Sequence, residues 1–159
     1  MTFSDYIANL ASEHQAIKHS EQECHYSDLS EDAQNAFSHR KMHYPCVVLD
    51  EGGAVFSGSD SQPYQTDFYQ LLFVDHVRDT GNATEIRDAF TRMKTVAKDF
   101  LKRMVRDRRR VPLMNRFSIV DVEMERAYLE SPALYGYAVA LKNLSLFVDL
   151  DCNQAFEED

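Results

Sequence analysis

The side chains best suited to metal chemistry are cysteines and histidines in the first third of the chain. Cys24-His25, His39 and His43-x-x-Cys46 offer the thiolate and imidazole ligands that zinc prefers. Their spacing matches no zinc finger or ribbon, and the residues between them are polar. The other interpretation is a set of scattered surface histidines with a small buried thiol at Cys46, and we favour it. We therefore expect no metal and no cofactor.

Asp75-His76 is the nearest approach to an acid/base pair. The two residues lie within the apolar run FYQLLFVDHV, residues 68–77, which is typical of a strand. Neighbouring residues of a strand point to opposite faces, so this pair cannot share one pocket side by side. Burying either residue would require a partner. We interpret the pair as a polar contact at a sheet edge or an interface, with catalysis as the weaker alternative.

Three carboxylates alternate along a later segment, at Asp121, Glu123 and Glu125. Positions i, i+2 and i+4 share one face of a strand, where they could bind a divalent cation. A solvated strand face is the simpler explanation. The same ladder could also contact a basic surface of a neighbouring subunit.

That basic surface has a candidate in KRMVRDRRR, residues 102–110. The chain holds 17 Lys and Arg against 26 Asp and Glu, a net charge of −9, yet this stretch is strongly positive. Positive charge at a helix C-terminus is favoured by about 0.3–1 kcal/mol per site, which does not account for three consecutive arginines. We favour a solvated helix end that also contacts acidic groups. A nucleic-acid contact is the alternative, but the run lacks the aromatic residues on which bases stack. The hypothetical interface comprises Arg106, Arg108, Arg109, Arg110, Asp121, Glu123 and Glu125.

Catalytic signatures are missing from the sequence. GGAVFSG lacks the Lys-Ser/Thr ending and the following helix of a phosphate-binding loop, and no GxSxG or HExxH occurs. We predict that the protein is not an enzyme.

The bulk composition indicates one globular domain over residues 1–159, with 44% hydrophobic residues. The acidic balance argues against general duplex binding, which requires neutralised phosphates. Three cysteines without a CxxC favour reduced thiols in a cytosolic setting. The sequence has no signal-peptide pattern and no apolar run of membrane-spanning length, so we expect an unexported protein without membrane contact.

Hydrophobic periodicity predicts two helices. The first begins at residue 3, with Thr2 and Asp5 as a capping pair, and fades near residue 19. The second is a continuous apolar stripe from 83 to 108, capped by Asn82 with Glu85 as return partner. Pro112 prevents its continuation.

The remaining segments alternate or are polar. We predict strands at 47–49, 68–77, 117–128 and 134–151, with 68–77 in the middle of the sheet and a bulge at Lys142-Asn143. Residues 20–42 form a polar surface connection in which a short helix could begin at Ser30. Residues 52–66 form a flexible loop, and 152–159 form an acidic tail. The fold class is α+β: an antiparallel sheet of about four strands with the long helix packed on one face, plus the N-terminal helix.

The order of these elements resembles a known family. A leading helix, the pair Tyr44-Pro45 before a strand, the strand FYQLLFVDHV, a helix containing FTRMKTVAKDFLKRM and two closing strands are similar to the tail-completion or tail-terminator proteins of long-tailed bacteriophages. Related neck and head–tail joining proteins share this outline. The resemblance covers roughly residues 3–150, and the segment 20–42 is longer than the family pattern.

The resemblance implies a small α+β subunit that forms a ring, commonly six-fold, and joins the tail tube to the head without any cofactor. It implies self-association, contacts with other phage tail or neck proteins, no sequence-specific nucleic-acid binding, and a location in the host cytoplasm or the virion. An alternative is a small adaptor or binding module that uses residues 52–66.

Overall fold

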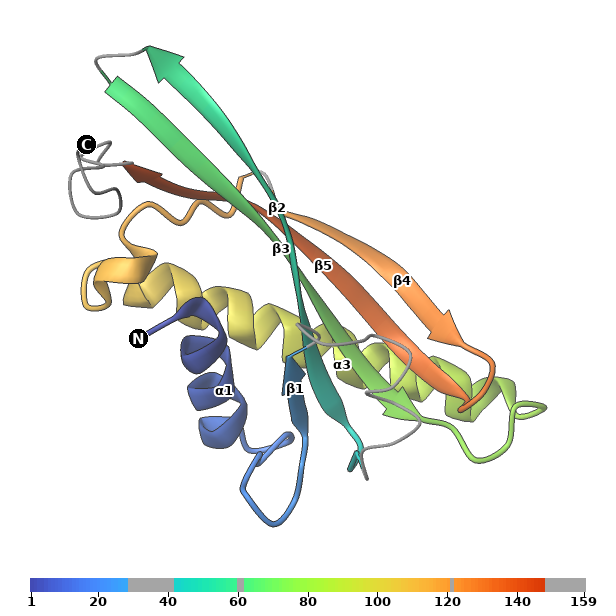
Figure 1. Cartoon of the computed structure of the whole chain (residues 1–159). Helices are drawn as coiled ribbons and strands as arrows, with labels where there is room; N and C mark the ends of the chain where they lie inside the picture. The colour runs from blue at the N-terminus through green and yellow to red at the C-terminus, as the bar shows by residue number, and fades with distance from the viewer. Residues whose placement is uncertain (29–41, 60–61, 121, 148–159) are drawn as a thin grey trace, which may run out of the picture.

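The long amphipathic helix organises the fold, as the computed structural model of the chain shows (Figure 1). The structure describes residues 1–28, 42–59, 62–120 and 122–147. Helix α3 spans Ala83–Asp107 and lies across one face of a five-stranded sheet, with the shorter helix α1, Phe3–Glu13, on the same side. The class is therefore α+β, with an N-terminal helix and one long helix. None of the helices described is long and apolar enough to cross a membrane.

The sheet corrects the predicted count and type of strand pairing. Its strand order is β1-β2-β3-β5-β4, and it is mixed because β1, Tyr26–Asp28, runs parallel to β2. The other neighbours are antiparallel. The bounds are Cys46–Ser59 for β2, Gln62–His76 for β3, Glu123–Leu129 for β4 and Leu134–Phe147 for β5. The prediction that 68–77 lies centrally is confirmed, because β3 has a partner on each side.

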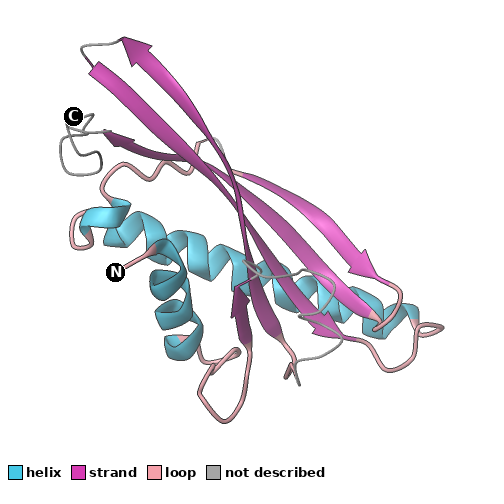
Figure 2. Cartoon of the chain, in the orientation of Figure 1, coloured by secondary structure: helices cyan, strands magenta, loops and turns pink. Residues whose placement is uncertain are grey.

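Residues 52–66 are the clearest error in the predicted elements. Instead of a loop, residues 52–59 continue β2 and residues 62–66 begin β3, so that the two strands form a long hairpin (Figure 2). Gly, Ser and Pro disfavour strands in general, but here the backbone ladder to β3 and β5 supplies the hydrogen bonds. With the end of β5, the hairpin makes a three-stranded arm that extends past the helices, which we call the hairpin arm.

Two bulges mark the base of this arm. Glu51 pairs with Tyr69 and Ala54 with Asp67, so Gly52 and Gly53 both lie opposite Phe68. On the other side Leu141 pairs with Tyr69 and Leu144 with Asp67, which places residues 142 and 143 opposite the same Phe68. The bulge predicted at Lys142-Asn143 is confirmed. Gly52 suits its position because a Cβ there would come within 2.9 Å of the carbonyl oxygen of Phe68.

Some other boundaries and caps of the helices and strands differ from the predicted ones. The capping box of Thr2 and Asp5 is confirmed, but α1 ends at Glu13 rather than near residue 19. Asn82 caps α3 as predicted, whereas the Glu85 carboxylate accepts hydrogen bonds from the backbone of the preceding turn, at Arg78 and Asp79, rather than from Asn82. The predicted strand 117–128 begins only at Glu123. A 3₁₀ turn, Pro112–Met114, follows α3.

The sheet has a core on each face. The larger core lies between the sheet and the helices, and in it the Phe73 and Phe100 rings meet edge to face at 5.1 Å. The smaller core, on the face away from the helices, contains Met42, Cys46, Val48, Val74 and Leu134. Consecutive residues such as Phe73 and Val74 belong to different cores, as strand alternation requires. Residues 29–41 and 148–159, which include most of the predicted connection and the predicted tail, lie outside the described residues.

Candidate functional site

The basic run lies at the end of α3, where the sequence predicted it. Part of it is used within the chain: Arg103 Nε donates to Asp107 at 2.8 Å and Arg103 Nη1 lies 3.1 Å from Glu13, while Lys102 pairs with Asp99. The four remaining arginines are exposed, and none forms an ion pair with another residue that the structure describes. They are Arg106, Arg108, Arg109 and Arg110.

The Arg103 contacts belong to a network that joins α1 to α3. Asp107 is only 4% exposed, and its carboxylate accepts hydrogen bonds from Arg103 Nε and from the Tyr6 hydroxyl, at 3.1 Å for the latter. Burial, and next the neighbouring Asp107 charge, raise the pKa of the Tyr6 hydroxyl above its ordinary range. The network thus keeps the hydroxyl protonated as a donor and fixes the end of α3 that carries the basic run.

The acidic ladder lies on a different surface. Glu123 and Glu125 project from β4 on the sheet face away from α3, because the intervening residues Met124 and Arg126 face the helix, Arg126 over the Phe90 ring. Glu123 pairs with Lys142 Nζ across the strands. Asp121, the third predicted member, lies outside the described residues. Within the described residues, the structure therefore forms no ion pair between Glu123 or Glu125 and the basic run of the same copy.

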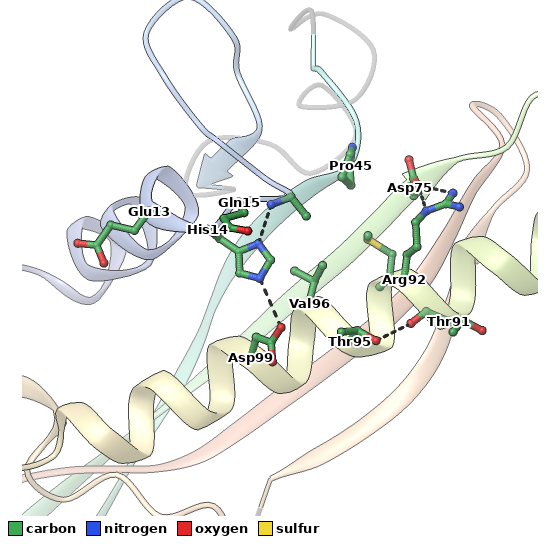
Figure 3. A pocket seen from close by; sticks show the side chains of 12 residues that line it. Glu13, His14, Gln15, Pro45, Asp75, Thr91, Arg92, Thr95, Val96 and Asp99 are labelled. Carbon is green, nitrogen blue, oxygen red and sulfur yellow. Dashed lines mark hydrogen bonds and ion pairs between the residues drawn. The ribbon is translucent and has the colours of Figure 1, made fainter.

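A cleft between the end of α1 and the middle of α3 was not predicted (Figure 3). Its volume is about 780 Å³, within the range of small-molecule sites. Asp75, 8% exposed, lines the cleft, and the Arg92 Nε and Nη2 atoms both donate to one carboxylate oxygen of Asp75, at 3.0 and 2.7 Å. The other oxygen accepts from the backbone of His76. The expectation that Asp75 and His76 face apart is confirmed, because the His76 ring packs against Tyr44 instead.

The opposite wall of the cleft carries a histidine. His14 Nδ1 accepts the Ala16 N–H, which leaves Nε2 to carry the proton toward the Asp99 carboxylate, 3.8 Å away. The Thr91 and Thr95 hydroxyls donate to carbonyls one turn earlier in α3. The charged side chains of the cleft thus pair with each other or with neighbouring side chains. This arrangement is better suited to binding a ligand than to activating a catalytic side chain.

The cysteine and histidine cluster does not form a ligand set. Among residues 1–28, 42–59, 62–120 and 122–147, no group of three or more His, Cys, Asp and Glu side chains is arranged to hold a metal ion. Cys46 is fully buried, as the favoured interpretation expected, and burial raises the pKa of its thiol. Cys24 Sγ donates to the Tyr26 carbonyl at 3.2 Å, and the rings of His25 and His43 lie 5.5 Å apart. His39 lies outside the described residues.

The hairpin arm is the third surface with functional potential. Every described β2 side chain from Asp50 onward is exposed, and the exposed fraction reaches 52% for Val55 and 68% for Phe56. Large apolar side chains on a protruding strand are typical of contact surfaces. Gly and Ser around these two residues weakened the strand signal in the sequence, although the pair Val55-Phe56 was readable as apolar.

Comparisons with known proteins add no relative: no family model, curated protein or solved structure matches the chain. The basic run, the acidic strand face and the hairpin arm are the surfaces best suited to contacts with another molecule.

Proposed function

We propose that the chain is a non-enzymatic assembly subunit that forms a homo-oligomeric ring at the tail or neck of a bacteriophage, like a tail terminator. The observation that carries the proposal is the separation of its charges. Four exposed arginines without a described ion partner stand at the end of α3, and carboxylates stand on the sheet face turned away from the helix. Unlike patches on different parts of one subunit are what a head-to-tail ring contact joins.

The acidic balance supports the same role. A ring through which DNA passes must not hold the DNA, and a net charge of −9 with an acidic strand face disfavours phosphate binding. Charge complementarity between copies contributes more to the specificity and rate of assembly than to its affinity. Apolar residues of the hairpin arm supply the contact area that charges alone do not.

The test combines sizing with charge reversal. Light scattering of the wild-type chain should give a mass several times 18.4 kDa. A variant with Arg108, Arg109 and Arg110 all changed to Glu should assemble weakly, and its remaining association should no longer depend on salt.

A matched control reverses three other exposed cations of α3, at Arg87, Lys94 and Lys98, and alters the net charge by the same amount. It should assemble like the wild type. A wild type that stays monomeric at all concentrations, or a reversal at 108–110 without effect on the mass, would contradict the proposal.

The second candidate is a small adaptor that uses the hairpin arm to bind another protein. The exposure of Val55 and Phe56 favours it. A monomeric wild type whose arm binds a separate partner would support this candidate over the ring.

A further inference from the structure

The sheet has two open edges, one on each side. On the β2 side, β1 pairs only with Val47–Leu49, so Asp50–Gly58 has no partner strand on its outer side within the described part of the chain. On the other side, β4 is the last strand among the residues that the structure describes, and there it pairs only with β5. Each edge presents a row of backbone N–H and C=O groups that a further strand could use.

The β2 edge lacks charged residues and prolines along the hairpin arm. Proteins protect sheet edges with charges, prolines or short strands, yet β2 carries no charged residue and no proline from Gly52 to Ser59. Each edge also carries two exposed large apolar side chains: Val55 and Phe56 on β2, and Tyr128 and Leu129, 65% and 38% exposed, on β4. β4 carries three charged residues: Glu123 is paired with Lys142, Arg126 is held over Phe90, and Glu125 is exposed.

We propose that the β2 edge of one copy pairs with the β4 edge of a second copy, so that the sheet continues from subunit to subunit. The proposal rests on the proposed function, because the partner is another copy of this chain. Pairing like edges across a two-fold axis would cover one edge and leave the other open, whereas head-to-tail pairing covers both. The edges therefore match a heterologous contact that repeats.

Strand directions fit this contact. β2 and β5 run in the same direction and β4 runs opposite to both, so β4 of one copy meets β2 of the next as an antiparallel pair.

Two edge variants test the pairing. One carries Val55→Lys and Phe56→Lys, and the other carries Tyr128→Lys and Leu129→Lys. Lysines at an edge oppose strand addition, so each variant should bind its neighbour at least about tenfold more weakly and sediment mainly as a monomer.

The control adds two lysines away from both edges, at Gln70 on the central strand and Ser12 on α1, both exposed. It should assemble normally, and circular dichroism melts should show all three variants folded.

Mixing the two edge variants gives the decisive result. Each variant retains the edge that the other lacks, so the mixture should form a one-to-one heterodimer and nothing larger. In the wild type, hydrogen exchange should slow at Asp50–Ser59 and Glu123–Leu129 when the concentration is raised into the assembled range.

Each contrary outcome is informative. If the β4 variant alone still dimerises while the β2 variant does not, the contact is isologous and the proposal is wrong. Large oligomers from both variants would also overturn the edge pairing while leaving the proposed ring intact. A monomeric wild type would overturn both proposals.

Discussion

Replacing Asp107 with Ala tests the network that joins the helices. The change removes the acceptor of the hydrogen bond from the Tyr6 hydroxyl. Tyr6 lies 101 positions away in the sequence and is only 3% exposed. A buried donor left without an acceptor costs about 1–3 kcal/mol. The Arg103 side chain is 38% exposed and keeps its ion pair with Glu13, so the loss of the Arg103–Asp107 ion pair adds at most about 1 kcal/mol. Relief of an acidic charge in the last helical turn returns about 0.3–1 kcal/mol.

The net expectation is a loss of about 2 kcal/mol in the free energy of unfolding, which corresponds to about 4–8 °C in melting temperature for a chain of this size. Urea denaturation followed by circular dichroism measures the free energy. Absorbance titration near 295 nm provides a second measurement, because the pKa of the Tyr6 hydroxyl should fall toward its ordinary value once Asp107 is gone.

A double-mutant cycle isolates the contact between Tyr6 and Asp107. In a Tyr6→Phe background no hydroxyl is left unpaired, so Asp107→Ala should cost about 1 kcal/mol less than it does in the wild type. Strictly additive effects of the two substitutions would show that the 3.1 Å contact contributes nothing, and the account of the network would be wrong.

Two further predictions concern a glycine and the tyrosines. Gly136→Ala should destabilise the fold by about 3 kcal/mol, because the new Cβ would come within 1.8 Å of the Phe73 carbonyl oxygen. Gly53→Ala is the control, because a Cβ at that position meets nothing within 4 Å. Equal urea midpoints for the two variants would contradict the prediction. Burial raises the pKa of Tyr26 and Tyr69 to about 12 from 10. Their contribution to stability is therefore complete below pH 10 and is lost as the pH rises toward 12, and a free energy of unfolding that stays constant over this window would refute it.

The elements that the sequence predicted well carry dense periodic signals. The stripe of α3 continues for its full length beside a covered face, so residues 83–108 predicted Ala83–Asp107 almost to the residue. The slip in alternation at Lys142-Asn143 located a bulge before any partner strand was known. Both signals arise because one face of each element is buried, and burial is what periodicity reports.

The hairpin arm and β1 lacked such a signal. Residues 52–59 face solvent on both sides, so no alternation marks them, and their Gly and Ser content indicated a loop. β1 has only three residues and owes its strand conformation to a distant parallel partner at Val47–Leu49. The local composition of a segment does not show which distant segment it will pair with.

Only part of the candidate cleft could be predicted from the sequence, for a related reason. An aspartate inside the apolar strand 68–77 signalled that Asp75 needed a partner. The sequence offered several cations for that role, and only packing of α3 on the sheet selects Arg92, 17 positions away. His14 and Asp99 carried no signal, because each looks like an ordinary polar residue of a helix surface or helix end.

The two bulges opposite Phe68 have a mechanical consequence. β2 and β5 each take up an additional residue at this level, whereas β3 passes it without a bulge, from Gln62 to Asp75, whose carboxylate binds Arg92. A force applied at Gln62 would therefore load the hydrogen bonds of β3 in shear and reach α3 through the Asp75–Arg92 contact. β3 is thus the continuous connection between the hairpin arm and α3, and the bulges of β2 and β5 are where these two strands can bend.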